Sequence, residues 1–89
     1  MSQVQANPEE LRAFAARLAN CSQAINEEAE GTAAAFSSLG DTWNDAKRSE
    51  FEEVFEELLS CIRRFHDACE DQVPYLQNLA SHLEDYNAL

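Results

Sequence analysis

The stretch Leu39-Gly40-Asp41-Thr42-Trp43-Asn44-Asp45 decides the fold, because it is the one short interruption between two long helical patterns. Gly40 is well placed for the left-handed conformation that closes a helix. Either Thr42 or Asp41 then caps the next helix, whose first residue is Trp43. With Thr42 as the cap, Asp45 is the third helical residue and can reach back, in a variant of the capping box that normally uses Glu or Gln. So tight a connection, over residues 40–42, predicts two antiparallel helices.

Before the turn, the sequence predicts a helix from about residue 8 to residue 39. Asn7 suits the N-cap position and Pro8 the first helical position. Apolar residues then recur at spacings of three and four, which is the pattern of a helix that packs along its length.

After the turn, a stronger pattern of the same kind predicts a helix from about residue 43 to residue 87. Pro74 falls inside it, but the apolar spacing keeps its phase, which predicts a kink rather than an end. We assign the hairpin or dimer seam to the large apolar residues of both helices: Leu11, Phe14, Leu18, Ile25, Phe51, Phe55, Leu58, Ile62, Phe65, Leu76, Leu79 and Leu83.

The apolar stripe of the second helix is wider than one partner helix can cover, because five further apolar residues flank it: Val54, Leu59, Cys61, Val73 and Tyr75. A second hairpin would cover the excess. The predicted fold is therefore all-α, a single antiparallel two-helix hairpin over residues 1–89 that dimerises into a four-helix bundle. The partner is a second copy or a related hairpin.

The charge of the chain excludes several classes of function. Six Lys and Arg stand against seventeen Asp and Glu, for a formal net charge of −11. Nucleic acids and anionic lipid surfaces both require a basic face, so neither is expected as a partner. No apolar run is long enough to cross a bilayer, and Met1 to Glu10 has neither the basic run nor the apolar stretch of a cleavable signal peptide.

The sequence has no pattern that predicts a catalytic or metal site. The Glu-x-x-His pairs of di-metal helical bundles are absent, since Arg63 and Leu79 stand three residues before the two histidines. Four glutamates at residues 52, 53, 56 and 57 fall between seam positions and are interpreted as a solvated outer face. His66 and Cys69 could approach each other, but a seam position blunts thiol reactivity, and His66 is expected at the surface. We therefore predict no catalytic residues, no metal and no cofactor.

The three cysteines, Cys21, Cys61 and Cys69, lack a metal-type spacing. They are interpreted as small apolar core residues in a reducing compartment. A disulfide between Cys21 and Cys61 is the minor alternative, because both lie at similar distances from the turn.

Trp43 is the only tryptophan, and it lies where the two helices meet. It is interpreted as a hydrophobic plug over the end of the hairpin. A recognition element at a loop tip is the alternative, because binding residues concentrate at such positions.

A lone Trp in the tight turn of a short two-helix hairpin, with Phe51 and Phe55 at the spacing where aromatics are expected, resembles the WXG family of small ESX-type proteins. The turn is similar to a Trp-x-Asp variant, with Asp45 in place of the family's Gly. The resemblance implies a dimer that a type VII secretion ATPase recognises through Trp43 and the partner's tail. The family's C-terminal export signal of Tyr, three residues and Asp or Glu is missing, since Tyr75 is followed at that spacing by Leu79.

The sequence and the resemblance together predict a non-enzymatic substrate or adaptor of a type VII-like secretion system. Gly40, Trp43 and Asp45 would form its recognition turn, and the protein would leave the cell without a cleavable signal peptide. The alternative is a cytoplasmic chaperone or targeting partner that pairs with a helical segment of a larger effector.

Overall fold

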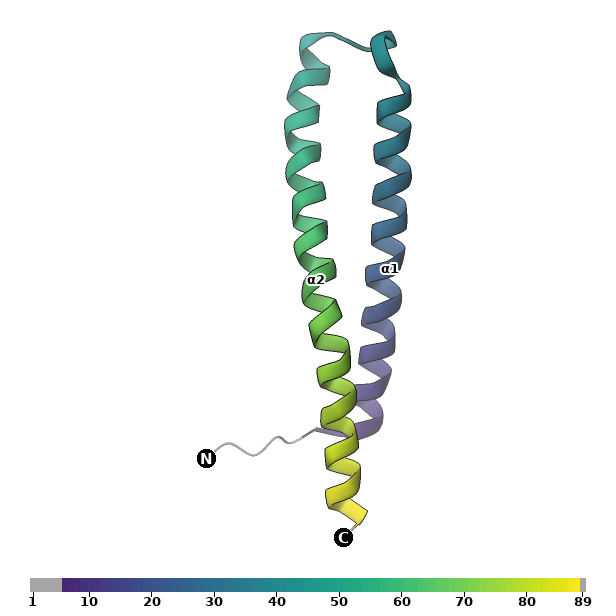
Figure 1. Cartoon of the computed structure of the whole chain (residues 1–89), viewed down its shortest axis with the longest axis vertical. Coiled ribbons are helices and arrows are strands. Elements are labelled where there is room, and N and C mark those ends of the chain that lie inside the picture. The colour runs from purple at the N-terminus through teal and green to yellow at the C-terminus, as the bar shows by residue number, and fades with distance from the viewer. Residues whose placement is uncertain (1–5, 89) are drawn as a thin grey trace.

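The computed structural model describes residues 6–88, and it shows two long antiparallel helices joined at one end (Figure 1). Helix α1 spans Pro8–Ser38, the 3-10 turn η1 spans Gly40–Thr42, and helix α2 spans Ala46–Ala88. The principal extents are 66 × 25 × 14 Å. The predicted all-α hairpin is confirmed, and α1 packs against α2. Residues 1–5 of the stretch tested for a signal peptide lie outside the described residues.

Polar side chains stabilise the open end of the hairpin, opposite the turn. Asn7 caps α1, because its Oδ1 accepts hydrogen bonds from the backbone N–H groups of Glu9 at 2.8 Å and Glu10 at 3.3 Å. Arg12 of α1 reaches across to α2, where it donates to Ser81 Oγ at 3.1 Å and forms an ion pair with Glu84. The hydrogen bond to Glu84 raises the pKa of Arg12 above its ordinary value.

Three of the six buried residues among those described have small side chains. Ala15 of α1 and Ala80 of α2 are completely buried, and Ser22 of α1 is 5% exposed. Larger buried residues come only from α2, namely Phe55, Cys69 and Leu76. Small residues let two helix backbones approach each other, so the larger neighbours are displaced to either side of the contact line.

The predicted seam divides into two sets of residues in the structure. Phe55 and Leu76 are buried, and a further group is half-buried against the opposite helix: Leu11, Leu18, Ile62, Leu79 and Leu83. The other five seam residues are exposed: Phe14, Ile25, Phe51, Leu58 and Phe65. Of these, Phe51 still touches the opposite helix, because its ring centroid lies 5.7 Å from that of Phe36. The sequence pattern alone did not separate the two sets, because large apolar residues beside a contact line keep the same helical spacing as those on it.

Helix α2 continues through Pro74 without a break, as the phase of the apolar spacing predicts. Among the described residues, neither helix is long and apolar enough to cross a membrane.

Candidate functional site

The turn closes α1 as predicted but starts α2 later than predicted. Gly40 has φ +51°, the left-handed conformation expected of it. Trp43 is extended, with φ −135° and ψ 101°, and α2 begins three residues later at Ala46. The expectation that α2 starts at Trp43 is therefore wrong.

The reason for the late start is a different choice of cap. The Thr42 hydroxyl donates backward to the carbonyl oxygen of Leu39, so it serves the end of α1 rather than the start of α2. Asp45 caps α2 instead, because its Oδ1 accepts the backbone N–H of Arg48 at 3.1 Å. The prediction that Thr42 or Asp41 caps α2 is corrected to Asp45.

Aromatic side chains fill the end of the hairpin beneath the turn. Trp43 is half-buried and meets the Phe36 ring edge to face, with centroids 6.2 Å apart and planes at 89°. It also lies 6.3 Å from Phe51, and Phe51 stacks on Phe55 at 5.5 Å. Such offset and edge-to-face pairs are favourable arrangements for aromatic rings. Trp43 thus covers the end of the hairpin in the manner expected of a plug, while part of its surface stays open to a partner.

Arg48 completes the turn, and sequence reasoning gave it no role. Its Nη1 donates to the carbonyl oxygens of Gly40 at 2.7 Å and Trp43 at 2.8 Å. Its guanidinium carbon lies 4.5 Å from the centroid of the Phe36 ring, and its Nε is 3.9 Å from the Glu52 carboxylate. No local sequence signal marks this residue, because its contacts depend on how the two helix ends meet in space.

A second feature is an exposed apolar face. It is formed by Phe14 and Ile25 on α1 and by Leu58 and Phe65 on α2, and we call these four residues the apolar face. Eleven residues separate the first pair and seven the second, spacings that return to the same side of a helix. A groove of 390 Å³ lies between the two helices on this side. It is lined by Ala24, Ile25, Glu28, Ala29, Thr32, Phe55, Leu58 and Ile62.

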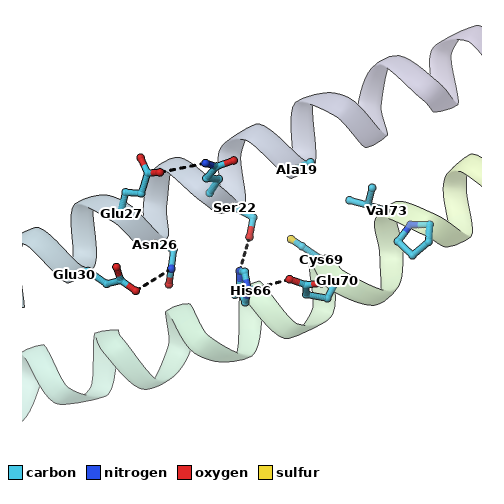
Figure 2. Close-up of a pocket in the computed structure, with 11 residues that line it drawn as sticks. Ala19, Ser22, Asn26, Glu27, Glu30, His66, Cys69, Glu70 and Val73 are labelled. Carbon is cyan, nitrogen blue, oxygen red and sulfur yellow. Dashed lines mark hydrogen bonds and ion pairs between the residues drawn. The ribbon is translucent and has the colours of Figure 1, made fainter.

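The other side of the hairpin carries a polar groove of 640 Å³ (Figure 2). His66 lies between the helices, with Nδ1 3.2 Å from Ser22 Oγ and Nε2 3.1 Å from Glu70 Oε1. His66 is half-buried, which corrects the expectation that it lies at the surface beside the seam. Glu27 of α1 also lines this groove, and Ile25 of α1 lines the apolar groove. Two residues correspond to a rotation of about 200° around a helix, so the two grooves lie on opposite sides of α1.

Ser22, His66 and Glu70 are residue types that hydrolases use together, but their setting does not suit that chemistry. Ser22 is buried in the contact between the helices. The regular helices that carry these three side chains use their backbone N–H groups internally, so no pair of free donors is offered to an oxyanion. The Ser22–His66 bond is best interpreted as a polar tie between α1 and α2.

The cysteines differ from one another in exposure. Cys69 is buried, as expected of a core residue, whereas Cys21 and Cys61 are exposed, and all three thiols are free. The core interpretation is therefore wrong for Cys21 and Cys61. Because Ser22 faces His66, Cys21 and Cys61 are offset by about 9 Å along the hairpin at 1.5 Å per residue, too far for a disulfide within one chain.

The four glutamates interpreted as a solvated outer face, Glu52, Glu53, Glu56 and Glu57, are all exposed. Within residues 6–88, no group of three or more His, Cys, Asp or Glu side chains is arranged to hold a metal ion.

Comparisons with known proteins agree with this geometry. A family model described as WXG100, proteins of 100 residues with WXG, matches residues 3–88. The wild-type secreted protein EsxB from Bacillus anthracis str. Sterne superposes with a TM-score of 0.74 at 19% identity, over 96% of this chain and 99% of that chain. A proline-to-alanine variant of EsxB gives a TM-score of 0.76 at 19% identity, over 96% of both chains. None of the curated proteins compared with the chain matches it.

Proposed function

The chain belongs to the WXG100 family, and from that premise we propose that it is a non-enzymatic substrate or adaptor of a type VII-like secretion system. It acts by pairing its apolar face with a second helical hairpin. The single observation that carries this proposal is the exposure of four large apolar side chains on one side of the molecule, Phe14, Ile25, Leu58 and Phe65.

The side chains of the apolar face are substantially open to solvent. Phe14 is 54% exposed and Leu58 51% exposed. Two helices pack against each other along a single line. A short chain of this kind buries a small share of its surface, so its folded state is only marginally stable without further contacts. A second hairpin laid on the apolar face would bury these side chains and turn one line of contact into the several lines of a four-helix bundle. The groove beside Ile25 and Leu58 is open to receive side chains from such a partner.

The turn supplies the second part of the proposal. Trp43 is held at the tip of the hairpin by Phe36 and Phe51, yet it is not fully covered. By the family resemblance, this partly open indole is the element that a secretion ATPase reads, together with the tail of the partner. Tyr75 is followed by Leu79 where the export signal has Asp or Glu, so Tyr75 does not begin that signal.

The pairing is tested by sedimentation equilibrium of the chain purified alone under reducing conditions, across a concentration series. A mass of twice the chain with a strong helical signal would identify the partner as a second copy. A poorly helical monomer that becomes helical with a co-encoded hairpin would identify the partner as a relative. A fully helical monomer that pairs with neither would contradict the proposal.

A matched pair of variants locates the interface. Leu58→Asp places one carboxylate on the apolar face, and Asn78→Asp adds the same charge at an exposed residue of α2 away from it. We expect Leu58→Asp to abolish the paired species and Asn78→Asp to leave it intact. Equal behaviour of the two would show that pairing uses another surface.

Export is tested separately in the host, by comparing culture medium and cells in strains with and without the secretion ATPase. Appearance in the medium only when the ATPase is present supports a secreted substrate. Retention in the cell, with release of a bound effector instead, would favour the cytoplasmic chaperone or targeting partner.

A further inference from the structure

Arg48 joins three parts of the turn through one side chain. It belongs to the first turn of α2, it bonds the carbonyl oxygens of Gly40 and Trp43, and its guanidinium lies over the Phe36 ring of α1. Its side chain is 20% exposed, which is low for an arginine on a hairpin this thin. The contacts to Gly40 and Trp43 bracket the segment in which the backbone changes from left-handed to extended.

The position of this cation is unfavourable for α2 taken alone. A positive side chain in the first turn of a helix faces the positive end of the helix dipole. Helix α1 ends at Ser38 without a basic residue in its last turn, so its negative end has no cation of its own. Arg48 supplies that cation from the neighbouring helix.

We propose that Arg48 is a positioning residue for Trp43. Its hydrogen bonds to the carbonyl oxygens of Gly40 and Trp43 hold the indole against Phe36 and Phe51. The surface proposed for recognition is therefore already formed in the free chain. This inference rests on the role proposed for Trp43. The order of the Trp43 side chain can nevertheless be measured on the chain without a secretion ATPase, so the two ideas can fail separately.

Arginine is suited to this task in a way that lysine is not. A guanidinium presents several N–H donors in one plane and can lie flat on an aromatic ring while it donates to oxygens at its edge. A lysine ammonium carries the same charge, but as a compact point without the planar fork. The Glu52 carboxylate, 3.9 Å from Nε, lies on another side of the guanidinium and helps to hold its plane.

The test uses Trp43 as the reporter, since it is the only tryptophan in the chain. Acrylamide quenching of its fluorescence and the near-ultraviolet circular dichroism are measured for the wild type, Arg48→Met, Arg48→Lys and Arg64→Met. Arg64 is a matched control, because it lies on the same helix, far from the turn, and donates to Ser60 at 3.4 Å. Far-ultraviolet circular dichroism at the same temperature confirms that each variant is still helical.

We expect Arg48→Met to raise the quenching constant of Trp43 and to reduce its near-ultraviolet signal while the helical signal is retained. Arg48→Lys should show the same changes to a lesser degree, and Arg64→Met should match the wild type. If Arg48→Met unfolds the chain, the quenching constant of Trp43 in Arg48→Lys is compared with that in the wild type, and this comparison tests the proposal. Wild-type quenching in Arg48→Lys, or in a folded Arg48→Met, would overturn the proposal.

Discussion

Ser22 of α1 and His66 of α2 share a hydrogen bond of 3.2 Å across the middle of the hairpin. Ser22 is almost completely buried, and it occupies a position where a large apolar residue would force the helices apart. The other nitrogen of His66 faces Glu70, so the ring is held on both sides. This polar tie fixes which residues of α1 and α2 face each other, a register that apolar contacts alone specify less sharply.

Removing the Ser22 hydroxyl should therefore weaken the fold. We expect Ser22→Ala to lower the free energy of unfolding by about 1 kcal/mol, because His66 loses its hydrogen-bond partner between the helices. Urea unfolding followed by circular dichroism measures the change. Ser37→Ala, at an exposed position of α1, corrects for the higher helix propensity of Ala. Equal midpoints for the two variants would mean that the Ser22–His66 bond contributes nothing.

Asp45 offers a test of the corrected start of α2. As the N-cap, its carboxylate accepts the backbone N–H of Arg48, so Asp45→Ala should cost about 1 kcal/mol. Asp45→Gly should cost only about a few tenths of a kcal/mol, because Gly is itself a tolerated cap. That difference explains how a Trp-x-Gly turn and the Trp-x-Asp turn of this chain can form the same hairpin. Thermal unfolding of Asp45→Ala and Asp45→Gly, with Asn44→Ala as the control, measures the two losses of stability. A larger loss for Gly than for Ala would contradict the cap.

The local features of this hairpin were predictable and the relations between its helices were not. Asn7 as the cap of α1 and Gly40 as its left-handed end follow from short-range backbone chemistry, which a sequence displays directly. The cap of α2 was missed because Thr42 and Asp45 are both good cap residues. Only the fold shows that the Thr42 hydroxyl turns back to Leu39.

The contact between the helices was predicted only in part, for a different reason. Ranking residues by hydrophobic size favours Phe14 over its neighbour Ala15, yet Ala15 is buried and Phe14 is exposed. Two helices can pack closely only where their facing side chains are small. A ranking by hydrophobic size does not identify such positions. Four of the large residues that sequence reasoning placed in the hairpin or dimer seam, Phe14, Ile25, Leu58 and Phe65, therefore lie exposed beside this contact rather than within it.

Phe55 and Leu58 separate the stability of the hairpin from its pairing. Phe55 is 7% exposed, so Phe55→Ala should lower the free energy of unfolding by about 3–5 kcal/mol. Leu58 is 51% exposed, so Leu58→Ala should lower the stability of the single chain by only about 1 kcal/mol, well below the loss at Phe55. The same Leu58 variant should weaken pairing with a second hairpin, as measured by sedimentation equilibrium. A large loss of single-chain stability in Leu58→Ala would place it in the hairpin seam after all.

Ala80 tests the close approach of the two helices. It is completely buried, and Ala80→Leu would insert three carbon atoms at a position with no solvent-exposed surface. We expect a loss of about 1–3 kcal/mol from overpacking. Ala13→Leu, at an exposed position of α1, makes the same chemical change without crowding and should be close to neutral. Denaturant midpoints of the two variants measure the difference, and a stabilised Ala80→Leu would show that the helices are less tightly packed there.

Thiol labelling distinguishes the free chain from the paired one. Cys21 and Cys61 are exposed and Cys69 is buried, so a thiol reagent should modify two cysteines quickly and the third only as the chain opens. Cys21 lies four residues before Ile25 and Cys61 four before Phe65, so both thiols lie one helical turn from residues of the apolar face. Pairing through that face should therefore slow the two fast reactions, which mass spectrometry across a dilution series would detect. Fast labelling of Cys69 in the folded chain would contradict the packing of α1 on α2. Unchanged rates at Cys21 and Cys61 on association would instead move the interface away from the apolar face.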